Sequence, residues 1–444
     1  MKKILSIILT AVILLFIIVP AAAVSQPYSG ITTANTPTQS ASLLFSKKFG
    51  SGYKGAPTPP TVVGDTLLVV SGLKLYKLNA KNGEEIASTK MQGSTLYAIV
   101  SPIYADGKIF VCLDGGIVQA FDYETMKSLW VYTDPLGGQA LCPITYDNGY
   151  IYTGFWNDET DYGNYVCLST KDEKTKEETE KKKATWTYKA MGGFYWAGCT
   201  VTKNFVVFGK DDGKEGSTSA SKIISLYKST GKKASSLNVK GDIRSSVVYS
   251  AENKAYYVSS KAGYVYKFKM NSSTGELSSL KTYKTYGAVT ATPVIYSGRL
   301  YIGCHNANAG KFIVLNSETM SEIYSCDTLG YPQASALVST AYEQSSGKIY
   351  IYLTYNSKPG GVTIFEDSVG QTSGRKSELF TPEGDMSQYC ISTVSAGNDG
   401  TLYYKNDSGN IFALTKKVQS KPSFFQRLIS SIKAFFEKIF SIFK

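Results

Sequence analysis

Aromatic rings and amide or guanidinium groups recur at one position of a repeated unit in this 444-residue chain. Rings of this kind stack on apolar faces, while amides and guanidinium groups satisfy hydroxyls or backbone groups. The set comprises Tyr97, Gln139, Tyr195, Trp196, Arg244, Tyr286, Tyr331, Gln333, Gln388 and Tyr389. Gathered around one opening, these side chains predict a funnel that binds a glycan or an extended peptide. The alternative is that a chain with 33 tyrosines places them everywhere.

The sequence offers little material for nucleophilic catalysis or for a metal site. His305 is the only histidine, and it lies in a polar turn between two strand-like runs. The nucleophile motif G-x-S-x-G and the metal or redox motif C-x-x-C do not occur. We therefore assign no catalytic residue and no metal ligand.

The cysteines are scattered along the chain. They are Cys112, Cys142, Cys167, Cys199, Cys304, Cys326 and Cys390. Most lie in β-patterned runs, where a buried thiol acts as a small hydrophobic group. Cys142 and Cys199 occupy similar positions in consecutive units, so a bridge between them is an alternative.

Short strands must hold these side chains in place, because one phrase recurs about every 40–50 residues. Leu75–Glu84, Val118–Lys127 and Phe312–Met320 are three copies of it. Each unit has four short runs rich in β-branched and aromatic residues, with Gly, Asn or Asp turns between them, which is typical of a propeller blade. The units begin near Thr61, Pro102, Pro143, Thr200, Ser246, Pro293, Ser339 and Thr393.

The last unit indicates how the ring closes. It ends after three strands, at Ile411–Thr415, while Leu43–Phe49 near the start is a strand without a unit. Pairing of these two segments would remove the exposed sheet edges. We predict an all-β fold, an eight-bladed propeller over residues 43–417 that is closed by an N-terminal strand.

Loop lengths indicate the binding face of this propeller. In a blade, the loops that lead into the first strand share a face with those that join the second and third strands. The longest loops of the second kind are Asn157–Tyr165, Asp211–Ser221 and His305–Lys311. Long loops on one face usually mark the binding side.

The segment Ala120–Trp130 resembles the repeat of pyrroloquinoline-quinone-like, or quinoprotein-type, propellers. Looser copies stand at Ile224–Lys232 and Asn271–Glu276, and the resemblance covers Leu43–Lys417. It implies an eight-bladed propeller that is similar in plan to the outer-membrane assembly factor BamB and to quinoprotein dehydrogenases.

The departures from this family affect the expected cofactors. Only Trp130 and Trp186 stand where the repeat prefers tryptophan, so the blades must pack through Leu, Tyr and Phe. The dehydrogenases of the family need a stacking tryptophan floor, a calcium site of clustered oxygens and a base carboxylate, and none of these can be placed here. We therefore expect neither the quinone (PQQ) nor calcium.

The N-terminal residues predict export. Lys2 and Lys3 precede the apolar run Ile4–Val19, and small residues follow Pro20, which is the order of a signal peptide over residues 1–23. An uncleaved anchor is the alternative. Residues 24–42 are rich in Ser, Thr, Pro and Gly and predict a flexible lead-in.

Residues 421–444 predict an amphipathic basic helix. Its apolar face contains Phe425, Leu428, Ile432, Phe435, Phe436, Ile439, Phe440 and Phe443. Such a helix suits a membrane surface, a partner protein or the rim of the propeller itself. By contrast, the mixed-charge insertion Lys171–Lys183 predicts a solvated extension of unit three.

The formal net charge of +12 favours anionic envelope surfaces over nucleic acid, which calls for a concentrated basic stripe. Together these features predict an exported, non-catalytic binding or scaffold propeller at the cell surface. Its partners would be a glycan, a peptide or an envelope protein, with an anionic membrane at the C-terminal helix. The alternative is an enzyme, either a quinone-dependent dehydrogenase or a propeller acting on polysaccharide.

Overall fold

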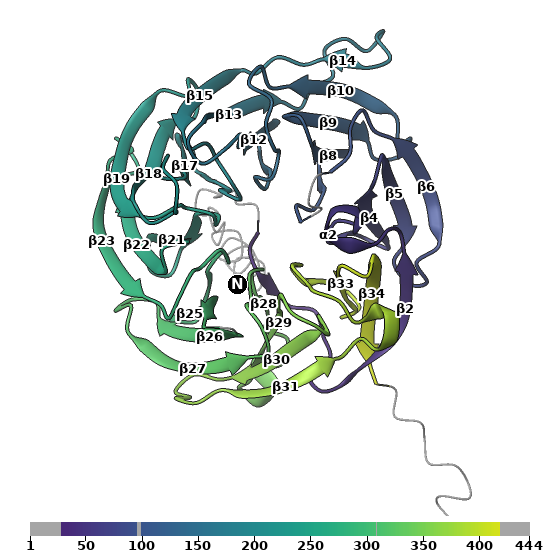
Figure 1. Cartoon of the computed structure of the whole chain (residues 1–444), viewed down its shortest axis with the longest axis vertical. Helices are drawn as coiled ribbons and strands as arrows, with labels where there is room; N and C mark the ends of the chain where they lie inside the picture. The colour runs from purple at the N-terminus through teal and green to yellow at the C-terminus, as the bar shows by residue number, and fades with distance from the viewer. Residues whose placement is uncertain (1–27, 96–98, 308, 418–444) are drawn as a thin grey trace, which may run out of the picture.

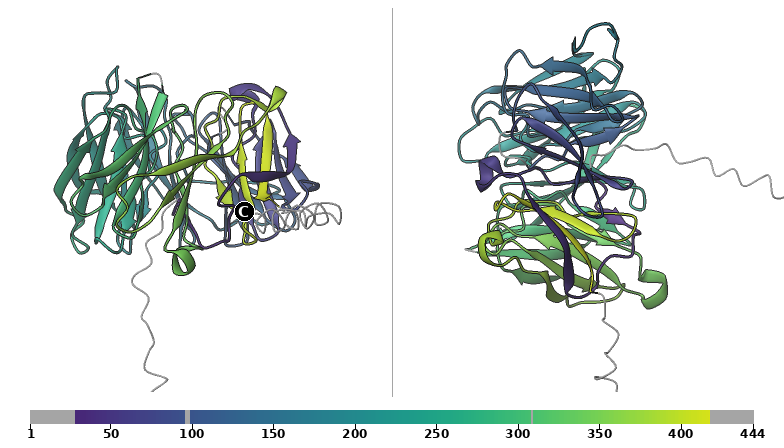
Figure 2. Two further views of the ribbon diagram at one scale, coloured as in Figure 1. Left: turned by 90° about the horizontal axis from the view of Figure 1, so that it is seen from below. Right: turned by 90° about the vertical axis from the view of Figure 1, so that its right-hand side faces the viewer.

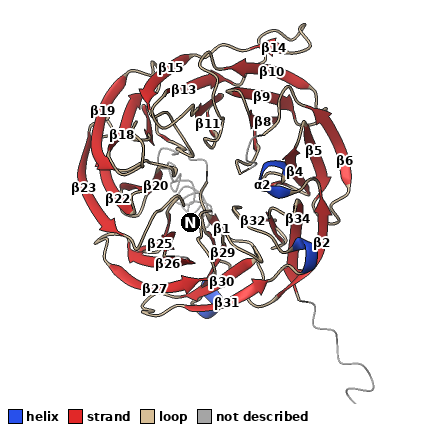
Figure 3. Ribbon diagram, viewed as in Figure 1, coloured by secondary structure: helices blue, strands red, loops and turns tan. Residues whose placement is uncertain are grey.

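The computed structural model describes residues 28–95, 99–307 and 309–417, whose strands form eight sheets arranged in a ring (Figure 1). Each sheet has a core of four antiparallel strands, which follow one another along the chain except at the closure of the ring, and two of the sheets carry a fifth, parallel strand. The first strand of each blade lies toward the ring axis and the fourth lies at the rim (Figure 3). The predicted eight-bladed all-β propeller is confirmed.

The first four blades follow the predicted units. Blade 1 contains β3 (Thr61–Val63), β4 (Thr66–Ser71), β5 (Lys74–Asn79) and β6 (Glu85–Lys90). Blade 2 contains β7 (Ile103–Ala105), β8 (Lys108–Leu113), β9 (Ile117–Asp122) and β10 (Ser128–Thr133). Blade 3 contains β11 (Thr145–Asp147), β12 (Tyr150–Gly154), β13 (Tyr162–Ser169) and β15 (Trp186–Met191). Blade 4 contains β16 (Thr200–Val201), β17 (Phe205–Gly209), β18 (Ala220–Tyr227) and β19 (Lys233–Lys240).

The other four blades complete the ring. Blade 5 contains β20 (Val248–Ser250), β21 (Ala255–Ser260), β22 (Tyr264–Met270) and β23 (Leu277–Lys284). Blade 6 contains β24 (Val294–Tyr296), β25 (Arg299–Asn306), β26 (Ala309–Asn316) and β27 (Glu322–Thr328). Blade 7 contains β28 (Leu337–Ser339), β29 (Ile349–Thr354), β30 (Val362–Asp367) and β31 (Arg375–Phe380). Blade 8 contains β32 (Ser395–Ala396), β33 (Leu402–Lys405), β34 (Asn410–Lys416) and, from the start of the chain, β2 (Ala41–Lys48).

Helices are confined to single turns in the described residues. They are α2 (Gly52–Gly55), α3 (Glu343–Ser346) and the 3-10 turn η1 (Gly384–Met386). Among these residues, none of the helices has the length and apolar character needed to cross a membrane.

The closure of the ring depends on β2, as predicted. This strand runs antiparallel to β34, with Leu43 opposite Leu414 and Lys47 opposite Ile411. The ring of Phe45 packs directly against Gly83 of blade 1. The two are so close that a Cβ atom added to Gly83 would lie 2.7 Å from the ring. The strand therefore ties the last blade to the first and covers an edge that would otherwise be open. Figure 2 shows the ring from the side.

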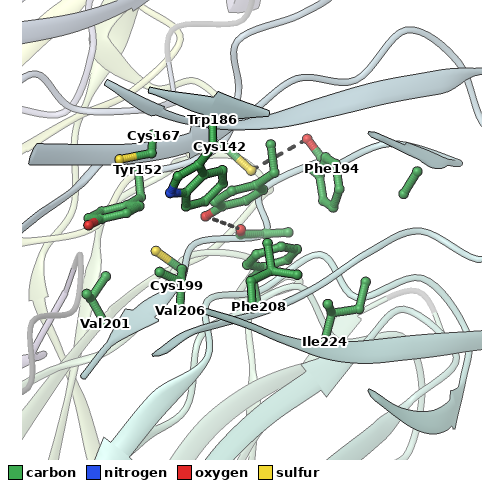
Figure 4. Packing of buried hydrophobic residues seen from close by; sticks show 14 residues of the cluster. Cys142, Tyr152, Cys167, Trp186, Phe194, Cys199, Val201, Val206, Phe208 and Ile224 are labelled. Carbon is green, nitrogen blue, oxygen red and sulfur yellow. Dashed lines mark hydrogen bonds between the residues drawn. The ribbon is translucent and has the colours of Figure 1, made fainter. Parts of the chain in front are cut away.

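The hydrophobic core lies between neighbouring blades. Figure 4 shows the cluster between blades 3 and 4, where the rings of Tyr165 and Phe208 stack with their centroids 3.9 Å apart. The indole of Trp186 donates a hydrogen bond across this junction to the carbonyl of Lys228, at 2.8 Å. Trp130 makes the corresponding bond across the preceding junction, to the carbonyl of Thr170 at 3.4 Å.

Tyrosines take this role where tryptophan is missing. The hydroxyl of Tyr257 donates to the carbonyl of Ser317 at 2.8 Å, which joins blades 5 and 6. Tyr403 donates to the carbonyl of Ala80 at 2.9 Å, which joins blades 8 and 1. The prediction that Leu, Tyr and Phe would pack between the blades is confirmed.

All seven cysteines are in the described residues and are free thiols. Six are buried in the clusters between blades, as expected of small hydrophobic groups, and Cys326 is half-buried. Cys142 contacts the carbonyl oxygen of Phe194 at 3.5 Å and is not bridged to Cys199. Burial raises the pKa of Cys112 and of Cys167 to about 12, so these thiols stay protonated.

The predicted solvated insertion at Lys171–Lys183 is confirmed for most of its length, since nine of its thirteen residues are exposed, but its C-terminal part is partly buried. Residues Glu180–Lys181 form β14, which pairs in parallel with β10 at the rim of blade 2 (Figure 1). Lys182 and Glu180 are buried there, with Nζ and Oε1 3.1 Å apart. The outer strand of a blade has unpaired backbone groups, and the insertion satisfies some of them.

The described part of the expected lead-in is also bound to the propeller. Residues Ile31–Thr32 form β1, which pairs in parallel with β28, the innermost strand of blade 7. Tyr28 donates a hydrogen bond to the carbonyl of Ala336 at 2.9 Å. Gly30 permits this approach, because a Cβ atom there would lie 2.5 Å from Val294. The backbone of this polar segment is thus satisfied by an inner strand. The predicted signal peptide and the predicted helix 421–444 lie outside the described residues.

Candidate functional site

The first and third strands of a blade run in the same direction, so two sets of loops share one face of the ring. These loops lead into the first strands and join the second strands to the third, and we call their side the upper face. Nine of the ten side chains predicted to line a funnel precede first strands on this face, whereas Tyr97 lies outside the described residues.

The structure brings Tyr195, Trp196 and Arg244 together at the junction of blades 4 and 5. Arg244 is the centre of a charged group that the sequence did not reveal. Its Nε and Nη2 atoms donate to one oxygen of Asp211, at 3.0 and 2.7 Å. Nη2 also lies 3.0 Å from Asp242 Oδ2 and 3.2 Å from Glu159 Oε1. We call Arg244, these three carboxylates, Trp156 and Tyr195 the Arg244 cluster.

Aromatic rings cover the guanidinium group. Its central carbon lies 4.7 Å from the ring centroid of Tyr195 and 5.8 Å from that of Trp156, within range of a cation–π interaction. The indole of Trp156 donates to Asp211 Oδ2 at 3.1 Å. The ring of Tyr195 lies 5.1 Å from that of Trp156 and 4.9 Å from that of Trp196. Rings and charges therefore hold each other in one arrangement.

Burial dominates the electrostatics of this cluster. Asp211 is fully buried, and burial raises its pKa to about 7 even though Arg244 works in the opposite direction. Burial acts to lower the pKa of Arg244, but Asp211 and Asp242 outweigh it, so the guanidinium stays charged. The Oδ1 atom of Asp211 has no hydrogen-bond partner in the described residues. This carboxyl group therefore takes up a proton near pH 7.

Two more polar atoms beside the cluster lack partners within the described residues. They are Nε1 of Trp196, a donor, and Oε1 of Gln139, an acceptor. The backbone of Gln139 is bridged to that of Trp156, with N···O distances of 2.8 and 3.1 Å, so Gln139 belongs to the same corner of the upper face as the cluster. A buried polar atom without a partner costs about 1–3 kcal/mol, which a bound group would recover.

A cavity of about 100 Å³ opens on the ring axis beside this corner. Trp196 and Gln333, two of the predicted residues, line it together with hydroxyl groups such as those of Ser246 and Thr290. Gln333 is held by Asn356, whose Nδ2 lies 2.6 Å from its Oε1. The axial cavity is therefore narrow, has a mostly apolar wall with a few hydroxyl groups, and reaches the aromatic corner through Trp196.

The other predicted residues do not converge on Arg244. Tyr286 is half-exposed on blade 6 and donates to Glu322 at 3.0 Å. Tyr331 packs edge-on against His305, with ring centroids 5.3 Å apart. Gln388 and Tyr389 lie before blade 8, and Tyr389 is half-exposed. The structure thus divides the predicted funnel into an ordered corner at blades 3–5 and separate side chains around the rest of the opening.

Sequence reasoning missed Trp156, Glu159, Asp211 and Asp242. Two of the three unusually long loops contain Glu159 and Asp211, so loop length was the available signal. Their carboxylates face Arg244 and do not form an open oxygen cluster. In the described residues, no group of three or more His, Cys, Asp or Glu side chains could hold a metal ion.

Comparison with known families supports the expected repeat. A family model described as "Outer membrane protein assembly factor BamB" matches residues 38–174. The resemblance to the quinoprotein-type propeller is confirmed. The matched part covers blades 1 and 2 and much of blade 3, with the closing strand β2. None of the curated proteins matches the chain.

Solved structures share the propeller fold over most of the chain. Quinohemoprotein alcohol dehydrogenase from Comamonas testosteroni aligns with a TM-score of 0.64 and 12% identity, covering 89% of this chain and 81% of the dehydrogenase. BamB from Moraxella catarrhalis aligns with a TM-score of 0.54 and 12% identity, covering 84% of this chain and 99% of BamB. The computationally designed Ika8 protein gives a TM-score of 0.57 at 13% identity, covering 83% and 99%. At such identities the likeness shows the fold alone.

Proposed function

We propose that this chain is a non-catalytic binding propeller of the cell envelope that holds an extended polypeptide segment at its upper face. The observation that supports this proposal is the pair of unpartnered atoms, Trp196 Nε1 and Gln139 Oε1, beside the rings of Trp156 and Tyr195. An extended peptide presents N–H and C=O groups alternately, so one bound segment can satisfy both atoms. Its side chains would pack on the rings.

The Arg244 cluster supports a binding role because it pre-organises this corner. Ion pairs to Asp211, Asp242 and Glu159 hold the guanidinium, and the guanidinium in turn supports the ring of Tyr195. A site whose side chains are already fixed loses less conformational entropy on binding. The cluster thus acts as a rigid support beside the peptide, and Arg244 is a positioning residue.

The same residues argue against a quinone-dependent reaction, which is the alternative function. A calcium ion needs six to eight oxygen ligands, and the carboxylates nearest the rings are already engaged by Arg244. The axial cavity of about 100 Å³ is below the range typical of cofactor sites. We therefore propose that the chain binds neither the quinone nor calcium.

The likeness to BamB suggests the kind of partner. The matching family is named as an assembly factor of the outer membrane, so an exported envelope protein is the natural source of the bound segment. Export through residues 1–23 and attachment of residues 421–444 to an anionic membrane belong to the same proposal. Co-sedimentation with anionic lipid vesicles, with and without residues 421–444, tests the attachment, and equal binding of the two forms would refute it.

A peptide array read with the purified mature chain tests the binding face. The array displays peptides with alternating apolar and polar residues, and Trp196→Phe is compared with the unaltered protein. Loss of the indole N–H should weaken binding about tenfold, or about 1.4 kcal/mol, because one buried hydrogen bond is lost. Trp186→Phe removes an indole N–H at a blade junction and serves as the matched control.

Two results would contradict the proposal. One is unchanged peptide binding by Trp196→Phe. The other is dye reduction with alcohol substrates after loading with the quinone and calcium, which would make the chain an enzyme.

A further inference from the structure

A second cavity lies on the opposite side of the ring, between blades 3 and 4. Its walls come from the turns that join first to second and third to fourth strands, which define the lower face. Asp147 and Asn148 lie in the turn of blade 3, and Asn204 and Lys228 lie in turns of blade 4. The cavity measures about 540 Å³, within the range of small-molecule sites. Tyr152 and Cys167, visible in Figure 4, form part of its inner wall.

Two charged groups in the wall of this blade 3–4 pocket neutralise each other, and Lys203 lines the pocket as a third. Lys228 Nζ lies 3.0 Å from Asp147 Oδ2, and the carboxylate is almost fully buried. The amide nitrogen of Asn148 lies 3.4 Å from each carboxylate oxygen. Lys228 is itself fixed, because its N–H bonds to the carbonyl of Asn204 at 2.8 Å and its carbonyl accepts from Trp186. The wall therefore presents ordered donors and acceptors close together.

Two tyrosine rings flank the opening of the pocket. Tyr150 is 40% exposed and Tyr227 is 43% exposed, although both line the cavity. The ring of Tyr227 packs against buried Phe205 with centroids 5.4 Å apart, which holds it in place. The pocket thus combines exposed rings with a neutral ion pair and amides.

We infer that this pocket binds a neutral saccharide of one or two rings. A saccharide carries donor and acceptor hydroxyls that match the Asp147–Lys228 pair and the amides, and its apolar C–H face suits tyrosine rings. A purely apolar ligand would bury the ion pair without replacing its hydration. A charged ligand of either sign would have to compete with the ion pair that Asp147 and Lys228 already form, and a basic one would also be repelled by Lys203. The inference is independent of the upper face, because the two sites lie on opposite sides of the ring.

Calorimetric titration of the mature chain with cellobiose, maltose and diacetylchitobiose tests this inference, with glucuronic acid and glucosamine as charged probes. At least one neutral disaccharide should bind, and Tyr227→Ala should weaken that binding about tenfold or more, by loss of the stacking surface. Tyr104→Ala is the matched control, since Tyr104 is 42% exposed but lies on blade 2 outside the pocket. Thermal melting of each variant shows whether it is folded.

Three outcomes would overturn the inference. They are failure of all three disaccharides to bind, binding of a charged probe alone, and equal loss of affinity in Tyr227→Ala and Tyr104→Ala. Asn204→Ala gives a second measure, since the amide is exposed at the wall and its loss should weaken binding without unfolding the blade.

Discussion

Replacing Asp211 by Asn should change how the stability of the propeller depends on pH. Asp211 is fully buried beside Arg244, and burial raises its pKa from the ordinary value of 3.8 to about 7. An asparagine has nearly the same shape and keeps an oxygen that can accept from Trp156 or Arg244. The variant therefore removes the titration of this site while disturbing the packing little.

The sign of the effect follows from proton uptake. Between pH 3.8 and about 7 the folded state holds a proton on Asp211 that the unfolded state has released. The stability that Asp211 contributes through this bound proton is fully present below pH 3.8. It is lost as the pH rises toward 7, by up to about 1.4 kcal/mol per pH unit. Across the window the native chain should lose roughly 4 kcal/mol relative to Asp211→Asn, and above about pH 7 the difference should stay constant.

Urea unfolding of the native chain and of Asp211→Asn, repeated at several pH values across this window, measures the difference directly. Asp65→Asn is the control, because the side chain of Asp65 is 86% exposed and should leave the pH profile unchanged. Parallel profiles for the native chain and Asp211→Asn would refute the argument, since they would mean that Asp211 titrates normally in the folded state.

The remaining predictions concern the packing of the ring. Phe45→Ala should lower the free energy of unfolding by about 2 kcal/mol, because it weakens the contact of the closing strand with blade 1. Leu44→Ala, at an exposed position, should lower it by less than half of that amount. Denaturant titration measures both changes. Lys182→Ala should cost about 3–5 kcal/mol, because the buried carboxylate of Glu180 keeps its hydrogen bond from the Glu173 N–H but loses its cationic partner. The double change Glu180→Leu/Lys182→Met should restore most of the loss, and a single variant as stable as the native chain would contradict this. Trp186→Phe should cost about 1–3 kcal/mol through its lost 2.8 Å hydrogen bond, seen as a lower melting temperature.

Much of the fold was predictable because each blade repeats the same local pattern. All eight predicted starts lie within two residues of the start of a first strand, from Thr61 at β3 to Thr393 before β32. The closing strand was also predictable, since the last unit had three strands and Leu43–Phe49 had no unit of its own. Such inferences need only periodicity, which the sequence displays directly.

The insertion Lys171–Lys183 could not be placed in this way. Its charged composition predicts solvation, which holds for most of its residues, yet Lys182 and Glu180 neutralise each other and become buried against blade 2. The described part of the lead-in behaves similarly, because an inner strand of blade 7 satisfies its backbone. In both cases a strand of another blade supplies the partner.

The candidate site likewise depends on partners that are far apart in the sequence. The sequence by itself determined the number of blades, their order and the face on which Tyr195, Trp196 and Arg244 lie, because these follow from repeat length and strand direction. Only the tertiary structure decided that Asp211, Asp242 and Glu159 converge on Arg244, from loops of three blades. The physical reason is that ion pairs and ring contacts act over a few ångströms in space, and the curvature of the ring brings together residues as much as 85 positions apart.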